Sequence, residues 1–238
     1  MVDDLGQPIG EPLPGWQPRP YPPGTVLTGR YCRLEPLVTR HVPSLHRALN
    51  LRDPSGRQWT YMPWGPFRDA DEFAALVDAL VAEPGILTLT IIDLRTGRPE
   101  GMAGWARIDP AIGSIEVRGI IYSPELQRTP AATEAMYLMA SHVFDDLGYR
   151  RYEWKCDALN ARSMAAARRL GFIYEGTWRN AMIYKGRNRD TAWFAMTGRD
   201  WAVRGRVISD WLDPGNFGSD GQQRSALSDL TVRCSASR

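Results

Sequence analysis

The sequence has few cysteines and histidines, no long hydrophobic run and almost no net charge. Its three cysteines and three histidines are scattered over 238 residues, so we expect reduced thiols and no metal site, because disulfide frameworks and metal clusters need regular spacing. The apolar runs fall far short of the ~20 residues that cross a bilayer. The acidic, proline-rich start also lacks the apolar segment of a secretory signal. These absences favour a cytoplasmic protein without a membrane partner.

The charge balance of the chain limits its partners further. A net charge of +2 argues against nucleic acid as a partner, because proteins that bind it carry a strong positive excess. Residues 148–190 nevertheless hold ten Lys and Arg against four Asp and Glu. This basic half suits a polyanionic ligand, and a solvated arginine-rich surface explains it equally well.

The domain organisation follows from length and composition. The chain is long enough for one sizeable core. Residues 1–25 hold seven of the 18 prolines, which predicts an extended N-terminal arm. We expect a folded domain at residues 26–200, then a C-terminal helix and polar tail at residues 201–238. Hydrophobic patterns predict strands at residues 26–37, 86–93, 102–109, 172–184 and 191–197, and helices at residues 39–50 and 69–82.

The stretch that carries the chemistry begins with a buried strand at residues 114–122, rich in β-branched residues. A helical pattern follows, which ends at Gly148. Thr129 is suited to cap this helix, and Pro130 stands at the first helical position, where a missing N–H costs nothing. The backbone N–H groups of Ala131 and Ala132 are then expected to face outward at the positive end of the helix, as in phosphate sites.

A second strand and helix repeat this arrangement. Residues 151–157 alternate like a strand, Asn160 is suited to cap, and residues 163–170 form a short helix that ends at Gly171. Each of the two strands is thus followed by the start of a helix. If the two strand ends are neighbours, the two helix starts form one binding site.

The order of these motifs resembles the GCN5-related N-acetyltransferases (GNAT), and most closely the branch of the RimJ/RimL-type ribosomal-protein N-terminal acetyltransferases. The matching residues are the loop from Gln127 to Ala132, Asn160, Ser163, Leu170-Gly171-Phe172 and Glu175-Gly176. The resemblance implies an α/β fold with a mixed, strongly twisted, largely antiparallel sheet and helices on both faces.

The resemblance also implies acetyl-CoA as co-substrate and assigns the residues that hold it. In this sequence they are Gly119, Ile120 and Ile121 at the thioester, Gln127, Arg128, Thr129, Ala131 and Ala132 at the pyrophosphate, and Asn160 at the pantetheine arm. One departure matters, because Pro130 replaces a glycine and has no N–H to donate. We expect Arg128 to compensate by a direct contact with phosphate.

Acyl transfer to an amine needs a base for the amine and an acid for the departing thiolate. Glu116 is the carboxylate best placed to be the base, and the alternative is a buried ion pair with Arg118 or a strand neighbour. The glutamate that serves the N-terminal-acetylating branch is replaced by Met182. Ser163 matches the residue that protonates the thiolate in that branch, and the alternative is helix capping together with Asn160.

Other residue types have weaker functional interpretations. Cys156 lacks a partner for nucleophilic catalysis, which favours packing. His41 and His46 are expected to be surface or packing residues, because no ligand cluster accompanies them.

The acceptor side is the least defined part of the site. The loop at residues 52–68 is dense in aromatic residues, and Trp59, Tyr61 and Trp64 either line the substrate or pack the loop down. They could equally form a homodimer contact. The implied function is transfer of an acetyl group to a primary amine of a small molecule or a peptide N-terminus. The alternatives are a non-catalytic acyl-CoA sensor or scaffold, or a succinyl-CoA-using transferase in which Arg118 binds the second carboxylate.

Overall fold

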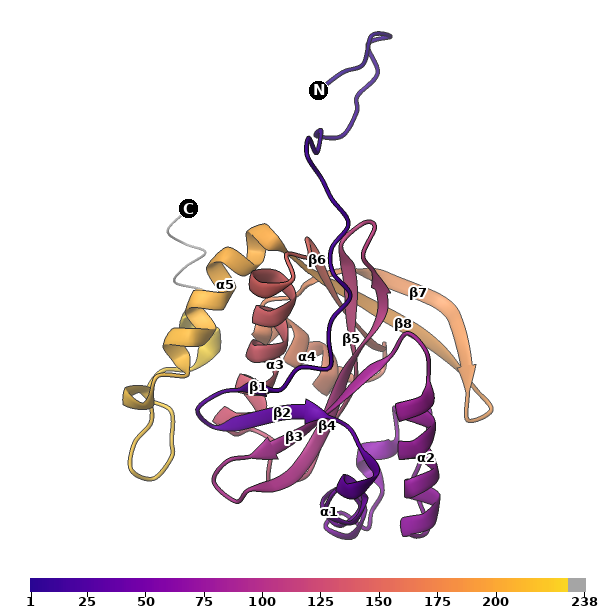
Figure 1. The fold of residues 1–238 in the computed structure, drawn as a ribbon, viewed down its shortest axis with the longest axis vertical. Helices are drawn as coiled ribbons and strands as arrows, with labels where there is room; N and C mark the ends of the chain where they lie inside the picture. Colours follow the sequence, from indigo (N-terminus) through magenta and orange to yellow (C-terminus); the bar gives the residue numbers. More distant parts are fainter. Residues whose placement is uncertain (231–238) are drawn as a thin grey trace.

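The computed structural model describes residues 1–230 and contains one twisted eight-stranded sheet (Figure 1). Its strand order is β1-β2-β3-β4-β5-β6-β8-β7, and only the pairing of β5 with β6 is parallel. This confirms the expected mixed, largely antiparallel sheet. The strands are β1 (Leu27–Thr28), β2 (Cys32–Pro36), β3 (Leu87–Asp93), β4 (Arg98–Asp109), β5 (Ser114–Tyr122), β6 (Arg151–Asp157), β7 (Ile173–Tyr184) and β8 (Arg187–Thr197).

Helices cover both faces of the sheet, as expected (Figure 1). One face packs against α3 (Pro130–Ser141), α4 (Ala161–Leu170) and α5 (Gly198–Trp211), and the other against α1 (Val42–His46) and α2 (Ala70–Ala82). Residues i and i+4 of a regular strand point to the same face, yet Val117 belongs to the first core and Ile121 to the second. The bulge at Gly119, described below, lies between these two residues.

The helix starts follow the sequence signals. The Thr129 side chain accepts a hydrogen bond from the Ala132 N–H, and Pro130 is the first residue of α3. The Asn160 side chain accepts from the Ser163 N–H at the start of α4. Asp69 caps α2. Both caps of the predicted site are therefore confirmed, because capping is decided by residues close in sequence.

The strand predicted at residues 26–37 is divided into β1 and β2. The interruption is stabilised by Glu134 of α3, whose buried carboxylate accepts the backbone N–H groups of Arg30, Tyr31 and Cys32 at 2.8, 2.6 and 2.8 Å. These N–H groups bind a carboxylate more than 100 residues away in the sequence, and no local pattern indicates such a contact.

Both terminal segments contact the domain. The start of the arm projects beyond it (Figure 1), whereas Glu11 pairs with Arg199 of α5 at 3.0 Å and Trp16 donates its indole N–H to the Ala111 carbonyl at 2.8 Å. After α5 the chain folds back, and Leu227 is 2 % exposed within the core. Cys234 lies outside the described residues. No helix among residues 1–230 is long and apolar enough to cross a membrane.

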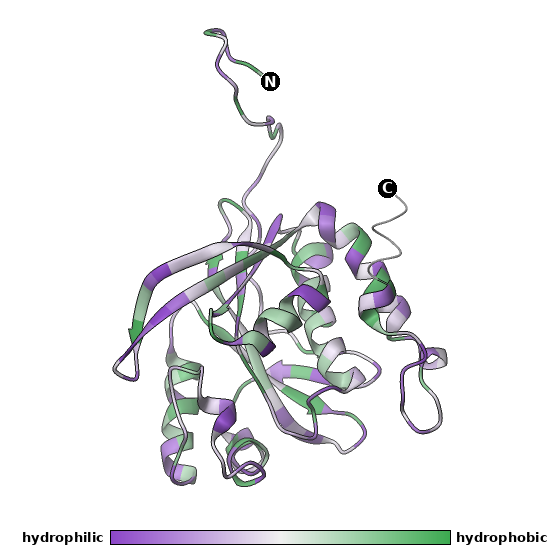
Figure 2. Ribbon diagram, turned by 180° about the vertical axis from the view of Figure 1, so that it is seen from behind, coloured by the Kyte–Doolittle hydropathy of each residue, from purple (hydrophilic) through white to green (hydrophobic). Residues whose placement is uncertain are grey.

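The β7–β8 hairpin reaches out from the rest of the sheet, and hydrophilic and hydrophobic segments alternate along it (Figure 2). Its tip is fastened at two points: Tyr184 donates its hydroxyl to Asp157 at 2.7 Å, and the Lys185 ammonium donates to the Trp59 carbonyl at 2.7 Å. The hairpin therefore frames the same side of the sheet as the aromatic loop.

Candidate active site

The parallel strands β5 and β6 separate halfway along their length. They pair from Ser114↔Arg151 to Val117↔Trp154, whereas β5 continues to Tyr122 and β6 to Asp157. Beyond Val117 the backbone groups of β5 and β6 that face each other therefore form no ladder hydrogen bonds between the two strands.

A β-bulge in β5 lies at this separation. Arg118 pairs with Gly104 of β4 and Ile121 with Met102, so Gly119 and Ile120 together oppose a single β4 residue. Gly119 has a φ of 62°, a left-handed conformation that glycine adopts without a steric penalty. Such a bulge bends the strand and interrupts its hydrogen-bond ladder. The predicted thioester-binding stretch, Gly119 to Ile121, thus has backbone groups directed away from regular pairing.

Two aromatic residues of the predicted acceptor loop lie at the same place. A Cβ on Gly119 would stand 3.7 Å from the Trp64 ring, and Tyr61 donates its hydroxyl to the Leu159 carbonyl at 3.1 Å. Trp59 differs, because it is 1 % exposed and packs edge-on against aromatic residues of the second core. For Trp59 the geometry favours packing over contact with a substrate.

Glu116 lies next to the bulge, on the sheet face that α1 and α2 partly cover. Its Oε2 atom is 3.0 Å from the Lys155 ammonium and 3.6 Å from the Arg107 guanidinium, and the side chain is 2 % exposed. Burial raises the pKa of Glu116 above its ordinary value by disfavouring the charged form, and Lys155 and then Arg107 partly offset this effect. Of the partners expected for a buried ion pair, Arg118 approaches Glu83 at 3.6 Å, whereas Lys155 is the strand neighbour that pairs with Glu116.

Ser163 lies on the other face of the sheet. Its hydroxyl oxygen accepts the Trp154 indole N–H at 3.0 Å, and Trp154 belongs to the core beneath α3, α4 and α5. Because that oxygen is already an acceptor, the hydroxyl proton can be donated elsewhere. Glu116 and Ser163 therefore face opposite sides of the sheet, and the end of the β5–β6 pairing is where these sides meet.

Asn160 stands at the end of β6 with one half of its amide occupied. The Oδ1 atom accepts from the Ser163 N–H at 3.1 Å, whereas its Nδ2 atom has no protein partner among the described residues. Asn160 therefore caps α4 through its side-chain oxygen. The two N–H donors of its Nδ2 atom are still available for a ligand.

The loop before α3 offers fewer backbone donors than expected. The Ala132 N–H donates to Thr129 Oγ1 at 3.2 Å, and the Thr133 N–H bonds the Thr129 carbonyl at 3.4 Å. Pro130 has no N–H. Within the described residues, the amides of Arg128 and Ala131 lack an acceptor. The Ala132 N–H, expected to face a ligand, thus donates to the helix cap in this structure.

Arg128 is placed to make up for part of this loss. It is exposed, has a φ of 61° and makes no ion pair in the described part of the chain. Gln127 instead turns back and donates its amide to the Tyr122 carbonyl at 3.1 Å, so it supports the loop from within.

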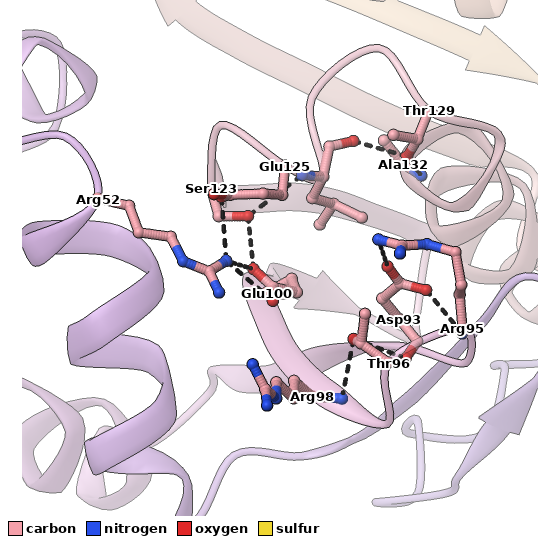
Figure 3. A network of polar contacts seen from close by, with 11 residues as sticks. Arg52, Asp93, Arg95, Thr96, Arg98, Glu100, Ser123, Glu125, Thr129 and Ala132 are labelled. Atoms are coloured by element: carbon pink, nitrogen blue, oxygen red, sulfur yellow. Dashed lines mark hydrogen bonds and ion pairs between the residues drawn. The ribbon is translucent and has the colours of Figure 1, made fainter.

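A buried network that sequence patterns did not indicate holds the start of this loop (Figure 3). The Ser123 hydroxyl donates to Glu100 at 2.7 Å, and the Arg52 guanidinium contacts both Glu100 oxygens at 3.1 and 2.9 Å. Arg52 also pairs with Glu125 at 3.0 Å. The network joins the loop to β4 and to the end of the first helical segment, three elements distant in sequence.

A polar pocket of about 320 Å³ lies beside Glu116. Its lining comprises Arg107, Arg151, Glu153, Glu175, Gly176, Trp178 and Trp193. Arg107 contacts Glu116, and both Arg107 and Lys155 approach the Trp193 ring, at 5.3 and 5.4 Å from its centroid. Arg107 is therefore the lining residue that connects the pocket to the candidate base.

The remaining candidates have structural roles. Burial raises the pKa of the Cys156 thiol, more than a hydrogen bond with Ser163 lowers it, which is the opposite of what a nucleophile needs. His41 bonds Glu35 and Thr90 inside the fold, and His46 packs beside Phe73. Among residues 1–230, no three His, Cys, Asp or Glu side chains gather where they could hold a metal.

Comparisons with known proteins agree with this geometry. A family model described as an acetyltransferase (GNAT) domain matches residues 32–173. A GCN5-related N-acetyltransferase from Brucella melitensis has 41 % identity and a TM-score of 0.90, over 92 % of this chain and 100 % of that chain. A protein from Chromobacterium violaceum ATCC 12472, described as a probable GNAT acetyltransferase, has 38 % identity and a TM-score of 0.76, over 82 % and 97 %. No curated protein sequence matches the chain.

The chain therefore belongs to the GNAT family of acetyltransferases. A more distant structure shares only the fold. It is an acetyltransferase from Salmonella typhimurium that modifies the N-terminal serine of the 50S ribosomal subunit protein L7/L12, with 19 % identity and a TM-score of 0.62, over 73 % of this chain and 99 % of that chain.

Proposed function

We propose that this protein transfers an acetyl group from acetyl-CoA to the primary amine of an acceptor. The observation that carries the proposal is the position of Glu116, buried and paired with Lys155 beside the Gly119 bulge, where β5 and β6 separate. A carboxylate with a raised pKa, next to unpaired backbone groups, combines a base with donors for a polarised carbonyl.

The residues of this chain would divide the reaction between the two faces of the sheet. Glu116 takes the proton from the acceptor amine, directly or through water, so that the nitrogen lone pair can form the C–N bond. The C–S bond breaks as that bond forms, and the Ser163 hydroxyl donates a proton to the departing sulfur. Bound acetyl-CoA supplies the acetyl group as a thioester. The serine then recovers a proton from solvent.

Binding of the coenzyme would rest on four kinds of donor. The bulge at Gly119 to Ile121 leaves backbone N–H groups for the thioester end. Asn160 Nδ2 would hold the pantetheine arm, and the free amides of Arg128 and Ala131 with the Arg128 guanidinium would hold phosphate. The residues present thus fit the coenzyme, with fewer loop amides than the sequence motif implies.

Acetyl is favoured over succinyl as the transferred group. The matching family model and the most similar solved structures reported above are described as acetyltransferases. Arg118, the residue expected to bind the second carboxylate of a succinyl group, approaches Glu83 at 3.6 Å, so a succinyl group would compete with that ion pair. The acceptor is a small-molecule amine or a peptide N-terminus. The N-terminal serine that the distant Salmonella protein modifies is a primary amine of this kind. We place the reaction in the cytoplasm, and a homodimer is compatible with the exposed apolar side chains of β7.

The test is release of free thiol from acetyl-CoA and succinyl-CoA over a panel of amines and short peptides, for the unmodified protein, Glu116→Gln and Ser163→Ala. Acetyl-CoA turnover that is lost in Glu116→Gln supports the transferase and its base together. Tight coenzyme binding without thiol release on any acceptor would favour a sensor or scaffold instead. Absence of coenzyme binding would reject both.

A further inference from the structure

The pocket beside Glu116 contains one cation with unused binding capacity. Arg151 is already paired with two carboxylates, because it bonds Glu153 at 2.6 Å and both Glu175 oxygens at 3.0 and 2.6 Å. Lys155 is committed to the buried carboxylate of Glu116. Arg107, in contrast, approaches Glu116 only at 3.6 Å, beyond hydrogen-bond distance, and its side chain is 56 % exposed.

The backbone holds Arg107 in this position. Arg107 has a φ of 48° and lies where the β4–β5 register shifts between Ala106 and Asp109. A left-handed conformation is costly for a residue with a side chain. The bulge points the guanidinium over the Trp193 ring, at 5.3 Å from its centroid, so its N–H donors lie at the pocket edge next to the candidate base.

The pocket walls suit a flat or apolar body. Trp178 is 59 % exposed, and its ring centroid lies 4.6 Å from that of Trp193. The Trp193 indole Nε1 is buried and has no hydrogen-bond partner among the described residues. The lining therefore offers aromatic surface and one partly free guanidinium. A ligand carboxylate would give this guanidinium a charged partner at the pocket edge.

We propose that the acceptor is a small amine that also carries a carboxylate, in the class of amino acids with an aromatic or apolar side chain. The inference rests on the proposed function. The carboxylate binds Arg107, the apolar body lies against Trp178, and the amine faces Glu116. A guanidinium and a carboxylate match in geometry and charge. A volume of about 320 Å³ suits a small molecule of this kind.

The same geometry disfavours a peptide N-terminus. In a peptide the carboxylate beside the terminal amine has become an amide, which has no negative charge for Arg107 to bind. The Arg107 guanidinium would then lose part of its contact with solvent without gaining a charged partner. The distinction between an acid and its amide is therefore the chemical signature of this acceptor.

The experiment compares matched acceptors. Values of kcat/KM would be measured for phenylalanine, phenylalaninamide and a short peptide with N-terminal phenylalanine, with acetyl-CoA saturating. We expect the free acid to be preferred over the amide about tenfold to a hundredfold, as for a charge-assisted hydrogen bond. The preference should fall close to unity in Arg107→Gln and persist in part in Arg107→Lys. Arg206→Gln, an exposed arginine on α5, is the matched control and should leave the preference intact.

A binding measurement supplements turnover. 3-Phenylpropionate, which has the carboxylate and ring but no amine, should inhibit the unmodified protein competitively against the acceptor and inhibit Arg107→Gln at least tenfold more weakly. Equal kcat/KM for acid and amide, or faster reaction of the peptide, would overturn this inference and leave the transferase intact. Absence of turnover on every acceptor would instead reject the proposed function.

Discussion

The Glu116 carboxylate lies 3.0 Å from the Lys155 ammonium at a place where 2 % of the glutamate side chain is exposed. The two groups come from neighbouring strands and lie on either side of the last paired position, Val117↔Trp154: Glu116 is one residue before it in β5 and Lys155 one residue after it in β6. Burial raises the pKa of this carboxyl group by disfavouring the ionised form, and the Lys155 ammonium partly offsets the rise by favouring that form. This balance is what a base needs, because it must be charged at neutral pH and still hold a proton well.

Replacement of Glu116 by Gln should lower kcat/KM for the acceptor by roughly 10²- to 10⁴-fold, the usual contribution of a positioned base. The dissociation constant of acetyl-CoA should change little, because Glu116 lies away from the phosphate loop. Steady-state kinetics and calorimetric coenzyme binding check both points. A fall of less than threefold in kcat/KM would reduce Glu116 to a structural ion pair.

The pH dependence of kcat/KM should show an acid limb with its midpoint above the roughly 4.3 of an unperturbed glutamate. The sign follows from the raised pKa: activity is present above that pKa and is lost as the carboxylate takes up a proton on acidification. Lys155→Met removes the largest effect that lowers this pKa, so the limb should move to higher pH. Lys155→Arg keeps the charge and should move it less. An unshifted limb in Lys155→Met would mean that another group controls it.

Asn160 allows capping and ligand binding to be separated. Asn160→Ser keeps a side-chain oxygen for the cap but removes the Nδ2 donors, so stability should change by a few tenths of a kcal/mol, whereas acetyl-CoA should bind about two- to tenfold more weakly. Asn160→Ala should lose about 1 kcal/mol of stability as well. Urea unfolding and coenzyme titration provide the readouts. Unchanged binding in Asn160→Ser would leave Asn160 with the cap alone.

Pro130→Ala should strengthen coenzyme binding. The change restores an N–H at the first helical position, and one additional hydrogen bond to phosphate is worth roughly two- to tenfold in affinity. Arg128→Gln should weaken binding by about tenfold and flatten its dependence on salt, because it removes a charge contact. Titrations at two salt concentrations test this. Weaker binding in Pro130→Ala would show that proline preorganisation outweighs the missing donor.

Glu134→Ala should be one of the most destabilising single changes in the protein. It leaves three backbone N–H groups of the β1–β2 turn without their acceptor, and each unsatisfied group costs about 1–3 kcal/mol, so a loss of about 3 kcal/mol or more is expected. Glu134→Gln, which retains an oxygen, should lose less. Glu11→Gln, an exposed glutamate of the arm, should lose almost nothing. Similar midpoints of urea unfolding for all three would contradict this account.

The features that the sequence predicted are those decided by near neighbours. The strand at residues 114–122, the caps at Thr129 and Asn160, and the stop at Gly171 all depend on a few adjacent residues. Their order was enough to indicate the family and hence the sheet. Val26 to Leu37 shows where this reasoning ends, because the division of that strand depends on Glu134, which lies far away in the sequence.

The features that could not be predicted depend on register between strands. Glu116 and Lys155 meet only because β5 and β6 align Val117 with Trp154, and a shift of one residue would place the two side chains on opposite faces. The bulge at Arg107 and the Arg52–Glu100 pair are likewise products of tertiary pairing. For Ala132 the motif predicted a free donor, whereas the Thr129 cap uses the same N–H.

The short pairing between β5 and β6 has a mechanical consequence. Strands β1 to β5 form one half of the sheet and strands β6 to β8 the other, and four residue pairs between β5 and β6 join the two halves. Beyond Val117 and Trp154 the two strands are not paired. A molecule that hydrogen-bonds to the backbone of both strands there would supply the contacts that the strands do not make with each other. Occupation of the site would stiffen the whole sheet, so that the two halves of the protein respond to the coenzyme as one body.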